Sequence, residues 1–337
     1  MEIFCYNSNN LKNINRAMIL KIFINFKCKD VPYGGGNQFV LKLVDYLESF
    51  TNYNITYDLE KDIDIYFLID IRKGGEFKKY SFEEIYIQKQ KYGGKIIYRI
   101  NNSDITRENK VLEPLILENV NKIDHFVFNS NFIKEYYFGK YSEFGKINYS
   151  IIYNTADRNI FFPKKENVLE KIKIVTHHWS DNINKGYDIY YQLYKYCQER
   201  NDLEFVFIGR KFNDKFIDSP KIIGPYKGKE LADALRGCDI YITASIYDAS
   251  PMHVLEGLSC GLPILYINHI GGGLDICMLS NEKVGESFND FTDLISAIDK
   301  IKNNYSVYSK SILNGIDLYN SDNCYKKYSE VFTLMAL

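Results

Sequence analysis

Two carboxylates stand out because of their spacing and their surroundings. Asp248 and Glu256 are separated by seven residues in the stretch DASPMHVLE, and Glu256 lies among Met252, Val254 and Leu255. A carboxylate in an apolar helix is costly unless hydrogen bonds satisfy it, and the hydroxyl groups of a ligand can do so. Taken singly, Asp248 could be a turn residue and Glu256 a surface residue of an amphipathic helix. Their combination favours a ligand site.

The residues between the two acids predict the start of a helix. Ser250 is a favoured N-cap residue and Pro251 suits the first helical position, while Gly261 predicts the end, so we expect a helix over residues 251–260. The strand expected just before it would direct the free N–H groups of the helix start into a cleft. Because a helix start carries partial positive charge, this segment predicts an anion site.

A regular alternation of strands and helices must position these residues. Strands are expected at residues 19–26, 64–71, 95–100, 125–130, 150–154, 171–178, 204–209, 221–225, 239–245 and 264–268. Helices are expected at residues 37–50, 108–121, 131–138, 186–200, 229–238, 251–260, 291–304 and 307–334. Apolar strands that alternate with helices predict parallel sheets covered on both faces. We therefore predict the α/β class, with two Rossmann-like domains facing each other across a ligand-binding cleft.

A polar, charged passage at residues 158–171 predicts the junction between the two domains. We expect an N-terminal domain over residues 1–157, in which residues 1–17 are a candidate extension. A C-terminal domain is expected over residues 158–314. The last helix, at residues 315–337, is a candidate to pack back on the N-terminal domain.

Composition limits the function classes. The 337 residues carry a formal charge of −1 with a pI near 6.5, so no basic field indicates nucleic acid as a partner. Seven cysteines without a C-x-x-C pair fit a reducing compartment. The early apolar run at residues 18–26 is far shorter than the roughly 20 residues of a membrane span. We expect a cytoplasmic protein; peripheral contact with a membrane and the oligomeric state stay open.

Five segments of the second half follow one another in a pattern known from an enzyme family. They are IYNTADRNIFFP, NKGYDIYYQL, LEFVFIG, ELADALRGCDIYITASIYDASP and DASPMHVLEGLSCGLPIL. In this order they resemble the retaining GT-B glycosyltransferases of the group 1, family 4 type, whose signature has two acids separated by seven residues. The resemblance implies a GT-B fold and hexosyl transfer from a nucleotide sugar, with a UDP- or GDP-sugar as co-substrate, no other cofactor and no metal.

The same resemblance implies roles for individual residues. Glu256 would bind the nucleotide ribose, Asp248 the hydroxyls of the donor sugar, and Lys185 would neutralise the charge that develops on the leaving diphosphate. Backbone amides at residues 252–254 would hold the diphosphate, and the loop at residues 225–226 would contact the base. The donor-binding candidates besides Glu256 are therefore Ser250, Met252, His253, Val254, Pro225 and Tyr226.

Two departures from the family pattern bear on activity. Asp248 stands where the family usually has glutamate, and the shorter side chain could alter the sugar preference. The family also carries an arginine shortly before the lysine, whereas the segment THHWSDNINK before Gly186 has none. His178 or Ser180 could fill that space, or Arg210 could reach in from the neighbouring strand end. Loss of this charge would weaken stabilisation of the leaving group.

The first half supplies weaker candidates. The segment PYGGGNQFVLKL reads as a glycine loop that enters a helix, and Gly35 and Gly36 would let the backbone approach a phosphate or an acceptor; a tight turn without a ligand is the alternative. Arg99, Asn102 and Asp104 follow a strand and are acceptor-side candidates, with structural roles as the alternative. The D-x-D of residues 62–64 favours a surface role over a metal.

Transfer passes through an oxocarbenium-like state, so positive charge and amide dipoles beside the diphosphate favour catalysis. The resemblance implies front-face attack by an acceptor hydroxyl, with a glycan, a lipid-linked saccharide or a protein glycan as acceptor class. A GT-B sugar-nucleotide epimerase and a non-catalytic module that binds nucleotide sugars or glycans are the alternatives. Isomerisation of the donor would indicate the epimerase, and binding without turnover would indicate the non-catalytic module.

Overall fold

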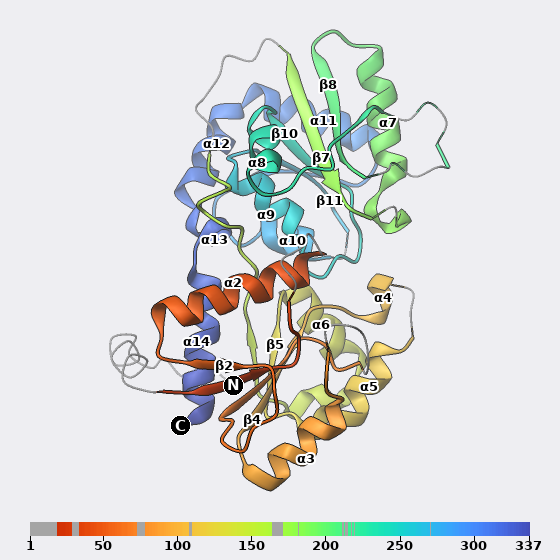
Figure 1. Ribbon diagram of the computed structural model, residues 1–337. Coiled ribbons are helices and arrows are strands. Elements are labelled where there is room, and N and C mark those ends of the chain that lie inside the picture. Colours follow the sequence, from red (N-terminus) through yellow and green to blue (C-terminus); the bar gives the residue numbers. More distant parts are fainter. Residues whose placement is uncertain are drawn as a thin grey trace. The chain divides into compact units, whose positions relative to one another are not determined.

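The computed structural model describes residues 19–28, 34–72, 78–107, 110–163, 171–180, 182–210, 212, 215–216, 218, 220–269 and 271–337. The described residues form two compact units, each built on one parallel β-sheet (Figure 1). Unit 1 runs to Tyr153 and takes in Asp322–Leu337, and unit 2 comprises Asn154–Ser321. Two six-stranded parallel sheets confirm the predicted α/β class. The extension predicted at residues 1–17 lies outside the described residues.

The sheet of unit 1 has the strand order β2-β1-β3-β4-β5-β6. Its strands are β1 (Lys21–Ile24), β2 (Asn54–Thr56), β3 (Ile65–Leu68), β4 (Lys95–Ile100), β5 (His125–Phe128) and β6 (Tyr149–Ile151). Its helices are α2 (Gly34–Phe50), α3 (Phe82–Tyr92), α4 (Asp104–Arg107), α5 (Leu112–Asn119), α6 (Asn131–Lys140), α14 (Asn323–Ala336) and the 3-10 turns Val120–Lys122 and Ser142–Lys146. The central strands β3 and β5 read IYFL and HFVF and are buried throughout, as expected for a parallel sheet with two covered faces.

The last helix of the chain completes the core of unit 1. On α14, the rings of Tyr328 and Phe332 meet the Phe67 ring of β3 edge-on, at centroid distances of 5.5 and 5.1 Å. The Tyr53 hydroxyl lies 2.5 Å from Thr333 Oγ1, also on α14. These contacts tie the end of the chain to a sheet formed by its beginning.

The sheet of unit 2 has the strand order β12-β11-β10-β7-β8-β9. Its strands are β7 (Ile172–His178), β8 (Leu203–Gly209), β9 (Ile222–Ile223), β10 (Ile240–Thr243), β11 (Ile264–Ile267) and β12 (Gly285–Phe288). Its helices are α7 (Tyr187–Gln198), α8 (Gly228–Arg236), α9 (Met252–Ser259), α10 (Gly272–Cys277), α11 (Phe291–Asn303), α12 (Tyr305–Asn314), α13 (Asp317–Asn320) and the 3-10 turn η3 (Ile183–Lys185). Helix α9 lies so close to β10 that a Cβ at Gly257 would come within 2.7 Å of the Tyr241 side chain.

Several predicted elements need correction. The single helix predicted at residues 307–334 is wrong: the structure has α12, α13 and α14, interrupted near Gly315 and at Ser321, which adopts an extended conformation. The helix predicted from residue 37 begins at Gly34, so the three glycines belong to its first turn rather than to a preceding loop. Strands β2 and β12 were not predicted, because both are short edge strands and read NIT and GESF.

Candidate functional site

Candidate residues of unit 2 lie in loops at one edge of its sheet. Strand β7 pairs in parallel with both β10 and β8, so the carboxyl ends of these three central strands lie at the same edge. Lys185 lies in the loop after β7, Arg210 directly follows β8, and Asp248 lies in the loop after β10. This edge of the sheet is where open α/β sheets bind ligands.

Lys185 is held against the loop that carries Asp248. Gly186 has φ +83°, and a Cβ there would lie 2.4 Å from the backbone oxygen of Ala244, so only glycine allows the two loops to approach this closely. The backbone N–H of Ile246 also donates to the carbonyl of Asn184 at 2.9 Å. As a result, Lys185 Nζ lies 2.5 Å from Asp248 Oδ2.

Asp248 is a charged group in a largely desolvated place. Its side chain is 18% exposed and that of Lys185 is 24% exposed. Burial alone would raise the pKa of Asp248, but the Lys185 ammonium holds that pKa well below its usual range. The residue before it, Tyr247, has a φ of +56°, a left-handed conformation that is uncommon for a large side chain. Strain of this kind often accompanies a functional loop.

Glu256 projects from α9 toward the end of β7. Its Oε2 lies 2.8 Å from His177 Nε2, and the other ring nitrogen of His177 lies 3.1 Å from the Tyr241 hydroxyl. The same hydroxyl lies 3.1 Å from His253 Nδ1. Neither His177 nor Tyr241 was predicted from the sequence as part of a site. A polar residue at a strand end was the only signal, and it does not reveal which helix lies opposite.

Each acid has one carboxylate oxygen that accepts no hydrogen bond from the described part of the chain. Asp248 interacts with Lys185 and, at 3.9 Å, with His253 through Oδ2, and Glu256 interacts with His177 through Oε2. Among the described residues no donor is bonded to Asp248 Oδ1 or Glu256 Oε1. Both side chains are 18% exposed, so these oxygens can accept hydrogen bonds from a ligand.

The start of α9 differs from the prediction. The helix begins at Met252, and Pro251 rather than Ser250 occupies the N-cap position, without a side-chain cap. Ser250 instead accepts a hydrogen bond from Asn154 Nδ2 at 3.2 Å, because it lies buried against the chain segment that follows β6. The Val254 amide donates to the Pro251 carbonyl at 3.1 Å, which leaves the amides of Met252 and His253 as the better candidates for an anion.

The three candidates for the missing arginine lie in different settings. His178 is 4% exposed and its Nε2 lies 2.9 Å from the Tyr190 hydroxyl, so it belongs to the core. Burial lowers its pKa well below the usual value, so it carries no charge for a phosphate. Ser180 Oγ accepts the N–H of Asn182 at 3.2 Å. Arg210 is exposed, and its guanidinium lies 4.9 Å from the centre of the Trp179 ring.

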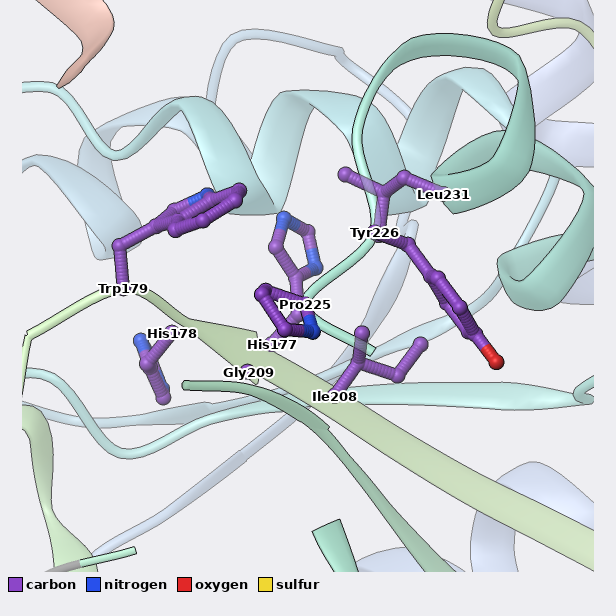
Figure 2. Close-up of a pocket in the computed structure, with 8 residues that line it drawn as sticks. All are labelled: His177, His178, Trp179, Ile208, Gly209, Pro225, Tyr226 and Leu231. Carbon is purple, nitrogen blue, oxygen red and sulfur yellow. The ribbon is translucent and has the colours of Figure 1, made fainter. Parts of the chain in front are cut away.

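A shallow recess lies beside these strand ends. It is lined by the ends of β7 and β8, the loop after β9 and the first turns of α8: His177, His178, Trp179, Ile208, Gly209, Pro225, Tyr226 and Leu231. Figure 2 shows Trp179 and Tyr226 on opposite sides, with Pro225 and His177 between them. The side chains that line it offer apolar and aromatic contacts to a ring at the surface.

The acceptor-side candidates of unit 1 mostly serve its own structure. Arg99 is 2% exposed, donates from Nε to the Tyr328 hydroxyl at 3.0 Å and lies 3.9 Å from the centre of the Phe39 ring. Asp104 accepts the N–H groups of Leu112 at 3.0 Å and of Glu113 at 3.2 Å, at the start of α5.

Asn102 and the two glycines are more open. Asn102 is partly exposed, and its Oδ1 accepts the N–H of Ser103 at 3.0 Å. Gly35 is exposed in the first turn of α2, and a Cβ at Gly36 would meet no atom within 4 Å. Packing within unit 1 therefore does not require glycine at position 36.

The D-x-D segment has structural partners. Asp62 forms an ion pair with Lys21 at 2.8 Å, and Asp64 accepts the Lys21 backbone N–H at 2.8 Å. In the parts of the chain that the structure describes, no group of three or more His, Cys, Asp or Glu side chains could hold a metal ion. None of the helices described is long and apolar enough to span a membrane.

Comparison with known proteins adds a family and a fold. Residues 159–316 match the sequence model of the family described as Glycosyl transferases group 1. No curated protein sequence matches the chain. Sucrose-phosphate synthase from Thermosynechococcus elongatus is similar in structure, with a TM-score of 0.67 and 12% identity over 94% of this chain and 98% of that one.

Two further solved structures are similar over much of the chain. HepE from Anabaena, in complex with UDP and glucose, has a TM-score of 0.64 and 11% identity over 94% of this chain and 100% of that one. The pneumococcal O-GlcNAc transferase GtfA, in complex with UDP and GlcNAc, has a TM-score of 0.59 and 12% identity over 80% of this chain and 56% of that one. At such identities the likeness shows the fold. The chain therefore has the GT-B fold, and its residues 159–316 form a glycosyltransferase domain of the group 1 type.

Proposed function

We propose that this glycosyltransferase moves a hexose from a UDP-sugar to the hydroxyl group of an acceptor. One observation carries the proposal: Asp248 and Glu256 each engage one protein partner, Lys185 or His177, through a single carboxylate oxygen and keep the other oxygen for a ligand. Sugar and ribose rings present neighbouring hydroxyl groups, which are the donors that two such acceptors need. Asp248 binds the transferred sugar in this proposal, and Glu256 binds the ribose.

The diphosphate lies next to Lys185 in this proposal. On binding, its oxygens share the Lys185 ammonium with Asp248, and the amides of Met252 and His253 at the start of α9 donate to it. As the bond to the sugar breaks, negative charge grows on the diphosphate, and a cation fixed at that point lowers the barrier. Arg210, exposed after β8, supplies further positive charge in place of the missing arginine.

The recess beside Trp179 is the proposed position of the base. Its lining by Pro225, Tyr226, Ile208 and Leu231 offers apolar contacts to a flat ring. We choose uracil because the HepE and GtfA structures contain UDP. GDP is the competing nucleotide in any test.

The acceptor belongs to unit 1 in this proposal. Arg99 is bonded to Tyr328 and Asp104 to the start of α5, so we propose the partly exposed Asn102 as the acceptor-side residue. Gly35 and Gly36 are proposed as positions where the backbone of α2 approaches a ligand, since the described part of unit 1 gives Gly36 no packing reason to be glycine.

The only tryptophan of the chain provides the test. Trp179 lines the recess, so its selectively excited fluorescence reports on a bound base. We expect UDP to change this fluorescence at lower concentration than GDP, and Lys185→Ala and Glu256→Ala to weaken the UDP response. Lys195→Ala, on the surface of α7, is the matched control and should leave it unchanged. Equal responses in wild type, Lys185→Ala and Glu256→Ala would remove the site assignment.

Turnover is measured next, as UDP release from UDP-glucose, UDP-galactose and UDP-GlcNAc with glycan acceptors present and absent. We expect release to depend on an acceptor and the product to retain the anomeric configuration. Conversion of one UDP-sugar into another without an acceptor would instead indicate an epimerase.

A further inference from the structure

A chain of buried polar groups connects the two acids of the site. It runs from Glu256 through His177, Tyr241 and His253 to Asp248, and we call its three middle members the His–Tyr–His relay. The successive distances are 2.8 Å from Glu256 to His177, 3.1 Å from His177 to Tyr241, 3.1 Å from Tyr241 to His253 and 3.9 Å from His253 to Asp248. The first three are hydrogen bonds, and the last is too long to be one.

The Tyr241 hydroxyl can donate to only one of its two histidine neighbours. Burial raises the pKa of Tyr241 well above its ordinary value, so the group keeps its single proton. Its oxygen also accepts the backbone N–H of His177 at 3.2 Å. One of the two Nδ1 atoms must therefore accept the phenol proton, and the other must carry a proton and donate it to the phenol oxygen.

The Glu256 end decides the direction. A carboxylate only accepts, so a neutral His177 carries its proton on Nε2 and leaves Nδ1 as an acceptor. Tyr241 then donates to His177, and His253 carries its proton on Nδ1. Burial lowers the pKa of His253 to about 4, so this ring is neutral at physiological pH and its Nε2 has a lone pair.

The outcome is two acceptors that face each other. His253 is 9% exposed, and its buried Nε2 has no hydrogen-bond partner in the described part of the chain. It lies 3.9 Å from Asp248 Oδ2, which is also an acceptor. A buried acceptor without a donor is unfavourable, and two side by side call for two donors on neighbouring atoms of a ligand.

We propose that His253 is a further sugar-binding residue of this enzyme. Asp248 and His253 Nε2 accept hydrogen bonds from two adjacent hydroxyl groups of the transferred hexose, and a sugar that lacks either hydroxyl binds more weakly. His177 and Tyr241 are positioning residues: they hold Glu256 and set the tautomer of His253, so that it accepts rather than donates. The assignment of the diol to the sugar rests on the proposed function.

The tautomers are tested without any ligand. In protein with nitrogen-15-labelled histidine, the ring signals should show His177 with its proton on Nε2 and His253 with its proton on Nδ1. Tyr241→Phe removes the phenol and should move the His253 proton to Nε2, where it can donate toward Asp248. Tyr190→Phe, which removes the buried phenol next to His178, is the matched control and should leave His253 unchanged. An Nε2–H tautomer of His253 in the wild-type protein would overturn the proposal.

Binding tests the diol. Calorimetry is carried out with UDP, UDP-glucose and the 2-, 3- and 4-deoxy analogues of UDP-glucose. His253→Phe should weaken UDP-glucose binding about three- to tenfold, as expected for the loss of one hydrogen bond. The affinity for UDP should change less than about twofold. One of the deoxy analogues should bind wild type and His253→Phe equally. His253→Gln, whose amide oxygen can accept, should recover part of the loss. An unchanged UDP-glucose affinity in His253→Phe overturns this inference alone, whereas a wild-type protein that does not bind UDP overturns the proposed function.

Discussion

Glu113 of unit 1 and the two acids at the site of unit 2 are held in different ways. In unit 1, Glu113 is 1% exposed and accepts four donors: the Asp104 N–H at 2.7 Å, Tyr136 at 2.9 Å, Lys140 at 2.7 Å and the Tyr141 hydroxyl. In unit 2, Asp248 and Glu256 are each fixed through one oxygen only. The folds of the two sheets are alike, so the difference lies in how completely the chain satisfies its own carboxylates.

This difference separates structural acids from ligand-binding ones. A buried carboxylate that the chain fully satisfies has no capacity left for a substrate, and its removal affects folding. A carboxylate that is anchored at one oxygen keeps its orientation and still accepts from a ligand. The four predictions below test this distinction.

The largest effect is expected at Lys185. Lys185→Ala should lower the rate of UDP release from the donor about 10²–10³-fold, because it removes the cation where negative charge develops in the transition state. Lys185→Arg keeps the charge and should lose less. Steady-state rates measure both, with Lys195→Ala as the surface control. A loss of less than about tenfold in Lys185→Ala would contradict the role proposed for this ammonium.

A large effect of a different kind is expected at Glu113. Glu113→Ala leaves two tyrosine hydroxyls and a backbone N–H without their acceptor, so it should lower the free energy of unfolding by about 3 kcal/mol. Glu118→Ala, on the exposed face of the same helix, should change it by less than about 0.5 kcal/mol. Urea unfolding gives these values. If Glu113→Ala folded normally but lost UDP binding, the contrast between the two units would fail.

The third prediction concerns pH. Burial lowers the pKa of His125 in unit 1 to about 4 from an ordinary value of 6.5. The unfolded chain therefore takes up a proton at His125 before the folded chain does, and stability that is complete above pH 6.5 is lost as the pH falls toward 4. The loss approaches about 3 kcal/mol, since each pKa unit corresponds to about 1.4 kcal/mol.

The check compares urea midpoints of wild type and His125→Gln at about pH 7 and about pH 4.5. The variant should lose less stability on acidification than wild type. His253 has the same sign in unit 2, because burial lowers its pKa to about 4 as well. Parallel losses in wild type and His125→Gln would show that His125 does not contribute.

Much of the architecture could be predicted from local patterns. Alternating apolar strands and helices predicted two parallel sheets, and the spacing of Asp248 and Glu256 predicted two acids at one helix. These features depend on neighbours in the sequence, which periodicity and turn residues report directly. The structure also brings Lys185 to Asp248, 63 residues later, but Lys185 was predicted from the family resemblance, and the catalytic roles of both residues stay predictions.

Other features depend on the order of the strands, which local patterns do not report. His177 meets Tyr241 only because β7 and β10 are adjacent in the sheet although two strands lie between them in the sequence. Arg99 is bonded to Tyr328, 229 residues later, so a sequence window around position 99 cannot tell a structural arginine from one that binds an acceptor. Such pairs become visible only when the chain is folded.

The smallest effect is expected at Arg210, which tests whether the missing arginine has been replaced. Arg200 precedes β8 and Arg210 follows it, so the two arginines lie at opposite ends of one strand. Arg200 is ion-paired with Asp202 at 2.8 Å, whereas Arg210 lies over Trp179 at the recess. Arg210→Ala should weaken UDP binding about three- to tenfold at low salt and less at high salt, because exposed charges are screened. Arg200→Ala, the matched control, should leave the affinity unchanged.

Calorimetry is the appropriate measurement, since removing a guanidinium from the Trp179 ring alters the fluorescence even without a ligand. Equal affinities of wild type and Arg210→Ala at low salt would mean that Lys185 and the amides of Met252 and His253 stabilise the diphosphate without help. The chain would then carry less positive charge at the diphosphate than the family pattern implies, and slow transfer would be expected even with the correct donor.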